Sequence, residues 1–286
     1  MFSLIVFLPL FASICVGVYG YRLGTKGVAL LTLLSLFSAA LLAFWYVLTT
    51  VFHVVPVYIN LFSWINVGLF SAQWSICIDS LTSFMLILVT TVSSLVYMYS
   101  LVYMLEDPHL IRFSCYISLF TFFMLILVTS ENLIQLFFGW EGVGICSYLL
   151  ISFWYTRIQA NKAAIQALVV NKIGDLGVML GIAGIFSIYQ TVDLSTFFLM
   201  TPYVLSQTFN FFTYEFSSIS VIGFLFFIGA VGKSAQLGLH TWLPSAMEGE
   251  RRLIYSFLYA AYTIIQPKQQ TWLITGISVN SAVLDL

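Results

Sequence analysis

Residues 227–249 read FIGAVGKSAQLGLHTWLPSAMEG and decide how the chain is interpreted. They close an apolar run that begins near residue 217, and about 30 residues would rise roughly 45 Å as one helix, more than a bilayer requires. Glycines flank a lysine, Lys233, and Pro244 follows. We therefore expect a helix over 217–247 that is broken near residues 232–238, as in transporters whose interrupted helices present backbone dipoles to a buried ion or water. The alternative, that the glycines only permit close helix packing, leaves the lysine unexplained.

Charged residues lie inside other apolar stretches in a fixed order, Glu141 and then Lys172 with Asp175. A charge near the middle of a bilayer costs at least a few kcal/mol, so by default it marks an ion or proton path. A buried lysine, unlike an arginine, can release its proton. We therefore predict a proton relay in which Glu141 pairs with Lys233. The alternative is a static buried ion pair that holds two helices together.

The contacts of Lys172 and Asp175 have two solutions. Residues three apart lie on one helical face, so the two side chains can pair within their helix. Asp175 can instead hold Lys172 in place while the lysine faces the helix of Glu141. His240 lies seven residues beyond Lys233, about two helical turns further on a similar face, and a histidine is suited to proton transfer near neutral pH. Its alternative role is hydrogen-bonded packing near the end of a span.

The composition is that of an integral membrane protein. The chain has 286 residues, of which 61% are hydrophobic and 7% charged, whereas soluble domains carry about 25% charged residues. A net charge of −1 argues against a nucleic-acid partner. The four cysteines form no C-x-x-C pair and no cluster with histidine, so we expect neither a zinc nor an iron–sulfur site. No nucleotide, flavin or haem motif is visible, so we expect no cofactor in this chain and any electrons to travel in another.

The expected fold is an all-α polytopic membrane protein with about eight transmembrane helices. The first apolar run precedes its basic residues, the reverse of a cleaved signal peptide, so it is read as a membrane helix. Residues 51–74 favour a surface hairpin of extended strands, and residues 191–216 form a second long connection. The predicted spans are residues 2–21, 28–50, 79–103, 112–130, 132–155, 162–190, 217–247 and 253–283.

The basic residues indicate an orientation. If the N-terminus faces outward, the outward loops hold Lys268 alone, and the inward loops carry an excess of positive charge, as cytoplasmic loops usually do. We therefore expect the N-terminus on the outer side. The inward basic residues are Arg22, Lys26, Arg112, Arg157, Lys162, Arg251 and Arg252.

Four stretches of the chain are distinctive: YMLEDPHLIR at residues 103–112, FGWEGVGICSY at 138–148, NKAAIQALVVNKIGDLG at 161–177 and the stretch at 227–249. Together they resemble the chain 5 family of mitochondrial NADH:ubiquinone oxidoreductase, respiratory complex I. The resemblance implies that Glu141 is the family's fifth-helix glutamate, Asp175 its sixth-helix aspartate and Lys233 its broken-helix lysine. Lys172 stands where the family commonly has arginine.

The sequence departs from the family pattern in three ways. Ser245 replaces a usual aspartate. A one-residue insertion after Gly249 aligns Tyr259 with the family's eighth-helix histidine, and a phenol is a poorer proton carrier near neutral pH. The family's second inverted repeat has no counterpart in these residues. We therefore divide the chain into N-terminal helices with a hairpin (1–111), a first antiporter-like repeat (112–265) and a divergent segment (266–286).

The resemblance implies a proton-translocating membrane-arm subunit that couples NADH oxidation and ubiquinone reduction to proton pumping. NAD, FMN, iron–sulfur clusters and ubiquinone are then expected in partner subunits. Expected partners are other membrane-arm subunits, membrane lipids and a separate chain that carries the second repeat. The implied location is the mitochondrial inner membrane, with the N-terminus on the intermembrane-space side. Two alternatives remain, a subunit of a multi-subunit cation/proton antiporter and a structural anchor that does not pump.

Overall fold

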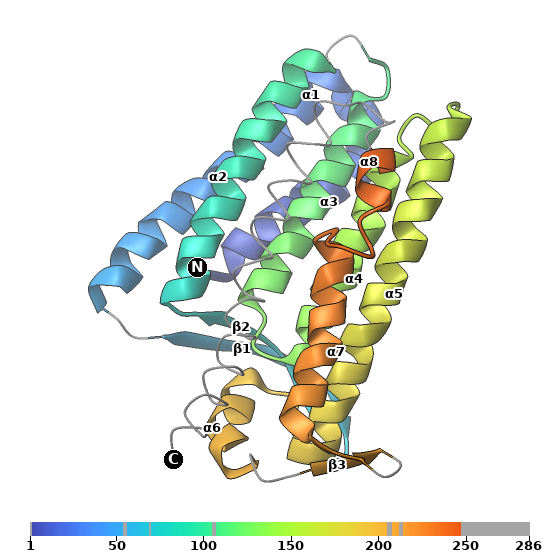
Figure 1. Cartoon of the computed structure of the whole chain (residues 1–286). Helices are drawn as coiled ribbons and strands as arrows, with labels where there is room; N and C mark the ends of the chain where they lie inside the picture. Colours follow the sequence, from blue (N-terminus) through green and yellow to red (C-terminus); the bar gives the residue numbers. More distant parts are fainter. Residues whose placement is uncertain are drawn as a thin grey trace.

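The computed structural model describes residues 2–53, 56–68, 70–104, 107–204, 208–211 and 214–246, and it is mainly a bundle of long helices (Figure 1). The predicted span at 253–283, the segment 266–286, Tyr259 and Lys268 lie outside these residues. The elements are α1 (Phe2–His53), β1 (Val57–Val67), β2 (Phe70–Ile78), α2 (Ser80–Tyr103), α3 (Leu110–Thr129), α4 (Leu133–Ile151), α5 (Ile158–Tyr189), α6 (Leu194–Val204), β3 (Thr208–Phe211), β4 (Tyr214–Ser217), α7 (Ser218–Lys233) and α8 (Trp242–Ala246).

Five of the described helices, α1 to α5, are long and apolar enough to cross a membrane. Helix α1 contains two of the predicted spans. Gly24, with φ 68° and ψ 172°, interrupts the helix between them. This positive φ is readily adopted only by glycine. Helix α7 is shorter and apolar, and it covers the first part of the predicted span at 217–247. The predicted spans within the described residues therefore all appear as helices.

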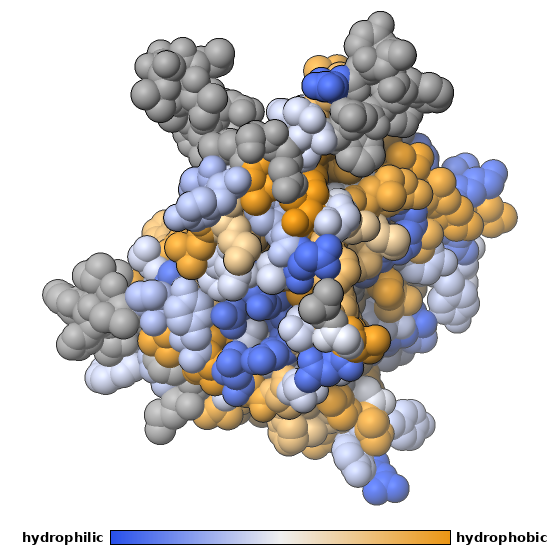
Figure 2. All heavy atoms as spheres, turned by 90° about the horizontal axis from the view of Figure 1, so that it is seen from below, coloured by the Kyte–Doolittle hydropathy of each residue, from blue (hydrophilic) through white to orange (hydrophobic). Residues whose placement is uncertain are grey.

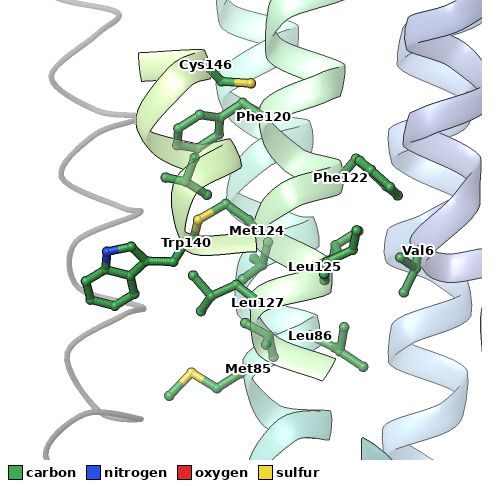
Figure 3. Packing of buried hydrophobic residues seen from close by; sticks show 14 of the residues in the cluster. Val6, Met85, Leu86, Phe120, Phe122, Met124, Leu125, Leu127, Trp140 and Cys146 are labelled. Carbon is green, nitrogen blue, oxygen red and sulfur yellow. The ribbon is translucent and has the colours of Figure 1, made fainter. Parts of the chain in front are cut away.

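Helix α3 is the most deeply buried of the long helices, because α1, α2 and α4 all pack against it. Figure 3 shows its side chains, including Phe120 and Leu125, meeting residues of the neighbouring helices in one apolar cluster. Tyr97 of α2 adds a buried polar link, since its hydroxyl donates to Ser114 Oγ of α3 at 2.9 Å and accepts from Thr32 of α1. Helix α5 then packs on α4, and α7 packs against α5.

The predicted surface hairpin is confirmed, and its second strand extends to Ile78. Strands β1 and β2 pair antiparallel and lie across the lower end of the bundle (Figure 1). Two residues of α4's N-terminal end bind β2: Gln135 Oε1 accepts from the Ser75 amide at 3.0 Å, and Asn132 donates to the carbonyl of Gln73. The connection predicted at 191–216 contains α6 and the β3–β4 hairpin at the same end.

The two ends of the bundle differ in character. At the upper end of Figure 1, the α2–α3 and α4–α5 turns meet, and Arg112 Nη2 donates to the carbonyl of Phe153 at 2.9 Å. At the lower end, hydrophilic residues gather in the middle of the face and hydrophobic residues surround them (Figure 2). A polar end on an apolar bundle is the arrangement expected of helices that cross a bilayer.

Candidate functional site

The predicted helix break occurs at Lys233. Helix α7 ends with this lysine, and Ser234 caps it. A short irregular segment follows, in which Ala235 and Gly238 have positive φ values of 49° and 102°. The chain then forms one turn and a half of helix in α8, where Trp242 donates its indole N–H to the carbonyl of Gly232 at 3.2 Å. The break thus places the end of α7 inside the protein, where the carbonyls of Ala230, Val231 and Gly232 accept hydrogen bonds from the residues that follow.

The side chain of Lys233 is enclosed between α7 and α4, and the residue is only 2% exposed. Its ammonium donates to the backbone carbonyl of Trp140 at 2.9 Å and lies 5.3 Å from the centre of the Trp140 ring. Gly144, one turn further along α4, leaves the space for this group, since a Cβ at Gly144 would lie 3.1 Å from the Lys233 nitrogen. A cation over an aromatic face and against a carbonyl is stabilised by both.

Asp175 of α5 is the second buried charge of the site and is 4% exposed. Its Oδ1 accepts a hydrogen bond of 2.6 Å from the indole N–H of Trp140. Its Oδ2 lies 4.0 Å from the ammonium of Lys172, one turn earlier on the same helix. One carboxylate is therefore shared between α4 and a basic residue of its own helix.

Lys172 forms its closest contact with Glu141 of α4. The structure thus selects the second of the two predicted arrangements, in which Lys172 faces the helix of Glu141 and lies near Asp175. This pair is less enclosed than Lys233, because the side chain of Lys172 is 51% exposed and that of Glu141 is 21% exposed. Lys172 is therefore the more exposed partner of this ion pair.

Both ion-pair helices place these charges near their middle. Glu141 lies eight residues after the first residue of α4 and ten before its last. Lys172 lies fourteen residues after the first residue of α5 and seventeen before its last. Since a helix rises about 1.5 Å per residue, these positions are far from both ends of the bundle. The charges are thus at the depth where a bilayer core is least favourable to them.

The predicted direct pairing of Glu141 with Lys233 does not form in the described residues. Glu141 forms its ion pair with Lys172. Lys233 instead donates to the backbone carbonyl of Trp140, the residue next to Glu141. The pairing could not be predicted, because helical spacing does not determine how far each helix is rotated.

His240 lies apart from the four charges. The prediction placed it on the same helical face as Lys233, and this is wrong because the helix ends at Lys233 and the intervening residues turn away. The side chain of His240 is exposed in this chain. A seven-residue spacing has meaning only within a continuous helix.

One residue of the site, Trp140, was not predicted, and a buried polar residue, Asn171, lies next to Lys172 in sequence. Trp140 contacts both buried charges, and the signal for it was available, because a buried indole N–H needs an acceptor. Asn171 of α5 lies one turn before Asp175 and is 5% exposed, and its Oδ1 has no hydrogen-bond partner. In the part of the chain that the structure describes, no three His, Cys, Asp or Glu side chains come together in a way that could hold a metal ion.

Helix α7 reaches the site because glycines line its contact with α5. Gly174 of α5 lies against Gly232 and Gly229 of α7, and a Cβ at Gly174 would stand 3.3 Å from the Gly229 carbonyl oxygen. Such small residues let two helices approach backbone to backbone, as in membrane helix pairs. The predicted alternative of glycine packing is therefore also correct, and it coexists with the break.

Comparison with known families gives two matches. Residues 64–114 match the family model described as NADH-ubiquinone oxidoreductase (complex I), chain 5 N-terminus. Residues 130–265 match the model described as NADH:quinone oxidoreductase/Mrp antiporter, TM. The second match contains Glu141, Lys172, Asp175 and Lys233.

Curated proteins agree with these matches. NADH-ubiquinone oxidoreductase chain 5 of Marchantia polymorpha is 54% identical over 257 residues, and that of Arabidopsis thaliana is 51% identical over 249 residues. Each alignment covers 87% of this chain. The sequence belongs with the N-terminal part of the NADH-ubiquinone oxidoreductase chain 5 family. The chain spans 38% of the length of the Marchantia protein and 37% of the Arabidopsis protein.

Comparison with solved structures establishes the fold of this chain. A chain of the Mrp complex from Dietzia sp. DQ12-45-1b superposes with a TM-score of 0.74 at 20% identity, covering 96% of this chain and 29% of that chain. A chain of the membrane-bound sulfane sulfur reductase, an archaeal respiratory membrane complex, gives a TM-score of 0.70 at 16% identity, covering 91% of this chain and 52% of that chain. The protein therefore has an antiporter-like fold and is a multi-pass membrane protein.

Proposed function

We propose that this chain is a proton-translocating subunit in the membrane arm of NADH:ubiquinone oxidoreductase. One observation carries the proposal. Three helices bring Glu141, Lys172, Asp175 and Lys233 into a continuous series of contacts at mid-bundle, with Trp140 between the last two. A charge at this depth is costly, so by default it marks a path for ions or protons.

The order of the contacts supports a transfer of protons rather than a single static pair. Lys172 lies between two carboxylates, bonded to Glu141 and 4.0 Å from Asp175. Its half-exposed side chain can shift between them without repacking the core. A lysine with a flexible stem, such as Lys233, can donate a proton and recover it. A purely structural pair would need neither a second acid nor a second base, since apolar packing replaces such pairs at little cost.

The remaining assignments follow from the chain 5 relatives. We assign the redox steps, with NAD, FMN, iron–sulfur clusters and ubiquinone, to partner subunits, and we place the protein in the mitochondrial inner membrane with its N-terminus toward the intermembrane space. Other membrane-arm subunits and lipids would surround it. The half-exposed side chain of Lys172 is unfavourable against lipid. We therefore assign the covering of this face to helices of the family's second repeat.

The alternative function is that of a subunit in a multi-subunit cation/proton antiporter. The structural similarity to a chain of the Mrp complex favours it, but that similarity extends to the fold alone at 20% identity. The curated relatives that are 54% and 51% identical in sequence are named NADH-ubiquinone oxidoreductase chain 5. The complex I assignment is therefore the stronger one, and copurification of the chain with NADH-oxidising subunits distinguishes the two.

The test substitutes Lys233 in the assembled complex. Lys233→Met removes the buried ammonium. Lys233→Arg keeps the positive charge, but its guanidinium does not release a proton. Both should lower the number of protons moved per NADH oxidised, or the coupled rate, by about tenfold or more, as expected when a proton-transferring group is lost. Lys162→Met, at an exposed lysine near the start of α5, is the control and should leave both quantities unchanged. Normal coupling in Lys233→Met would overturn the proposal.

A further inference from the structure

Trp140 is the one residue through which the buried acid of α5 and the buried base of α7 are joined in the described structure. Its indole N–H donates to Asp175 Oδ1 at 2.6 Å, and its carbonyl accepts from Lys233 Nζ at 2.9 Å. The face of its ring also lies 5.3 Å from the same ammonium. Trp140 itself is 3% exposed, so no solvent competes for these bonds.

The direction of the side chain separates Trp140 from the packing residues around it. Figure 3 shows the Trp140 ring projecting from α4 away from the cluster formed by Leu127, Met124 and Leu125. The ring therefore extends toward α5, where its N–H meets the carboxylate. An indole used only to fill space would gain nothing from this direction, because aliphatic residues already fill the α3–α4 contact.

The local backbone also supports this arrangement. The Trp140 carbonyl lies within α4, beside Gly144, and the missing side chain at Gly144 admits the lysine. A helix carbonyl can accept a second hydrogen bond, because each carbonyl oxygen has two lone pairs. Since one residue makes both contacts, a shift of α4 or of the Trp140 ring changes the surroundings of Asp175 and of Lys233 together.

We propose that Trp140 is a positioning residue that fixes the separation and orientation of Asp175 and Lys233, and so controls proton transfer between them. This inference rests on the proposed function, because it assumes that Lys233 transfers protons. The charged groups that surround Trp140 are Glu141 on its own helix, Lys172 and Asp175 on α5 and Lys233 on α7. Trp140 does not exchange a proton. It holds the two groups that do.

The main test is Trp140→Phe in the assembled complex. Phenylalanine retains an aromatic face and the backbone carbonyl and loses only the N–H that binds Asp175. We expect normal assembly, a coupled rate lowered by about fivefold or more, and a changed pH profile of that rate. Trp140→His, which restores a ring N–H, should recover part of the rate. A double variant, Trp140→Phe with Asp175→Asn, should be no slower than Asp175→Asn alone, because Trp140 acts through Asp175.

The control is Trp154→Phe. Trp154 lies just after the end of α4, where its ring centre is 5.4 Å from that of Phe153 and the site charges are absent from the turn. Its pH profile should match that of the wild type. If Trp140→Phe and Trp140→His both fail to assemble, Trp140 has a structural role and the inference is overturned.

Lys233→Met separates this inference from the function on which it rests. If Lys233→Met lowers coupling while Trp140→Phe keeps the wild-type rate and pH profile, the inference alone is wrong. If Lys233→Met has no effect, the proposed function is wrong, whatever Trp140→Phe does.

Discussion

Gly174 of α5 and Gly232 of α7 touch backbone to backbone. A Cβ on Gly174 would lie 3.2 Å from the Cα of Gly232, and a Cβ on Gly232 would lie 3.0 Å from the Cα of Gly174. These distances are shorter than ordinary van der Waals contact, so a side chain at either position would force the two backbones apart. Because Gly232 directly precedes Lys233, this contact sets how closely the lysine approaches α4.

Gly174→Ala should therefore impair both assembly and coupling. The added methyl meets backbone atoms, which cannot rotate away, and overpacking of this kind costs about 1–3 kcal/mol. The amount of assembled complex on a native gel and the proton-coupled rate should both fall. Gly223→Ala is the control, since nothing lies within 4 Å of a Cβ at that position of α7, and it should leave both unchanged. Wild-type values for Gly174→Ala would mean that the helices separate without consequence.

Glu141→Gln tests the outer part of the relay. The substitution keeps the shape of the side chain and removes the charge that binds Lys172, so the ammonium is left with Asp175 at 4.0 Å. We expect assembly to persist and the proton-coupled rate to fall by about tenfold or more. Proton uptake by vesicles during NADH oxidation measures the effect. Glu215→Gln, at an exposed carboxylate in β4, should have none, and unaltered pumping in Glu141→Gln would remove this residue from the relay.

Arg112→Lys should loosen the end of the bundle where the α2–α3 and α4–α5 turns meet. The guanidinium binds the Phe153 carbonyl and lies 4.7 Å from the ring of Phe153 and 5.4 Å from that of Tyr155. Lysine lacks the planar group that makes these contacts at once, so we expect a loss of about 1 kcal/mol. Faster protease cleavage in residues 152–157 would report it. Arg157→Lys, at an exposed arginine of the same turn, should cleave at the wild-type rate.

Asp193→Asn should change stability in a way that depends on pH. Burial, and then the neighbouring Glu131 carboxylate, raise the pKa of Asp193 above its ordinary value. The folded chain therefore binds this proton more firmly than the unfolded chain, so the contribution to stability is present at acidic pH and is lost as the pH rises through the raised pKa. Asparagine cannot ionise, so the variant should be the more stable at neutral pH, by about 1 kcal/mol or less at this half-buried position.

The melting temperature of the solubilised complex at a series of pH values measures this difference. The gain from Asp193→Asn should shrink toward acidic pH. Glu131→Gln, which removes only the neighbouring charge, should give a smaller gain in the same direction. A gain that is the same at every pH would contradict the assignment.

Much of the fold was predictable because membrane helices can be identified in a sequence by their length and apolar composition. The spans, the hairpin before α2 and the break at Lys233 all appear where composition and glycine placement indicated. The two halves of α1 were also predicted as separate spans, and Gly24 separates them. Patterns of this kind depend on local residues, so they can be read without knowing how the helices pack.

The pairing within the site could not be predicted in the same way. Glu141, Lys172, Asp175 and Lys233 were each identified from the cost of burying charge, but which acid meets which base depends on the rotation and separation of α4, α5 and α7. Trp140 was missed because an aromatic residue in an apolar helix is normally interpreted as a packing residue of the core. His240 was misplaced because the break removed the helical register that the prediction assumed.

The β1–β2 hairpin has a mechanical consequence for the helices above it. It continues directly into α2, is bonded to the first turn of α4 through Gln135 and its cap Asn132, and touches α5 through Phe70 and Phe186, whose ring centres lie 5.1 Å apart. Axial sliding of α2, α4 and α5 past one another would break these bonds. Rearrangement of the charged contacts therefore requires less force as a tilt about the hairpin end, with the larger displacement at the opposite end, where the α2–α3 and α4–α5 turns meet.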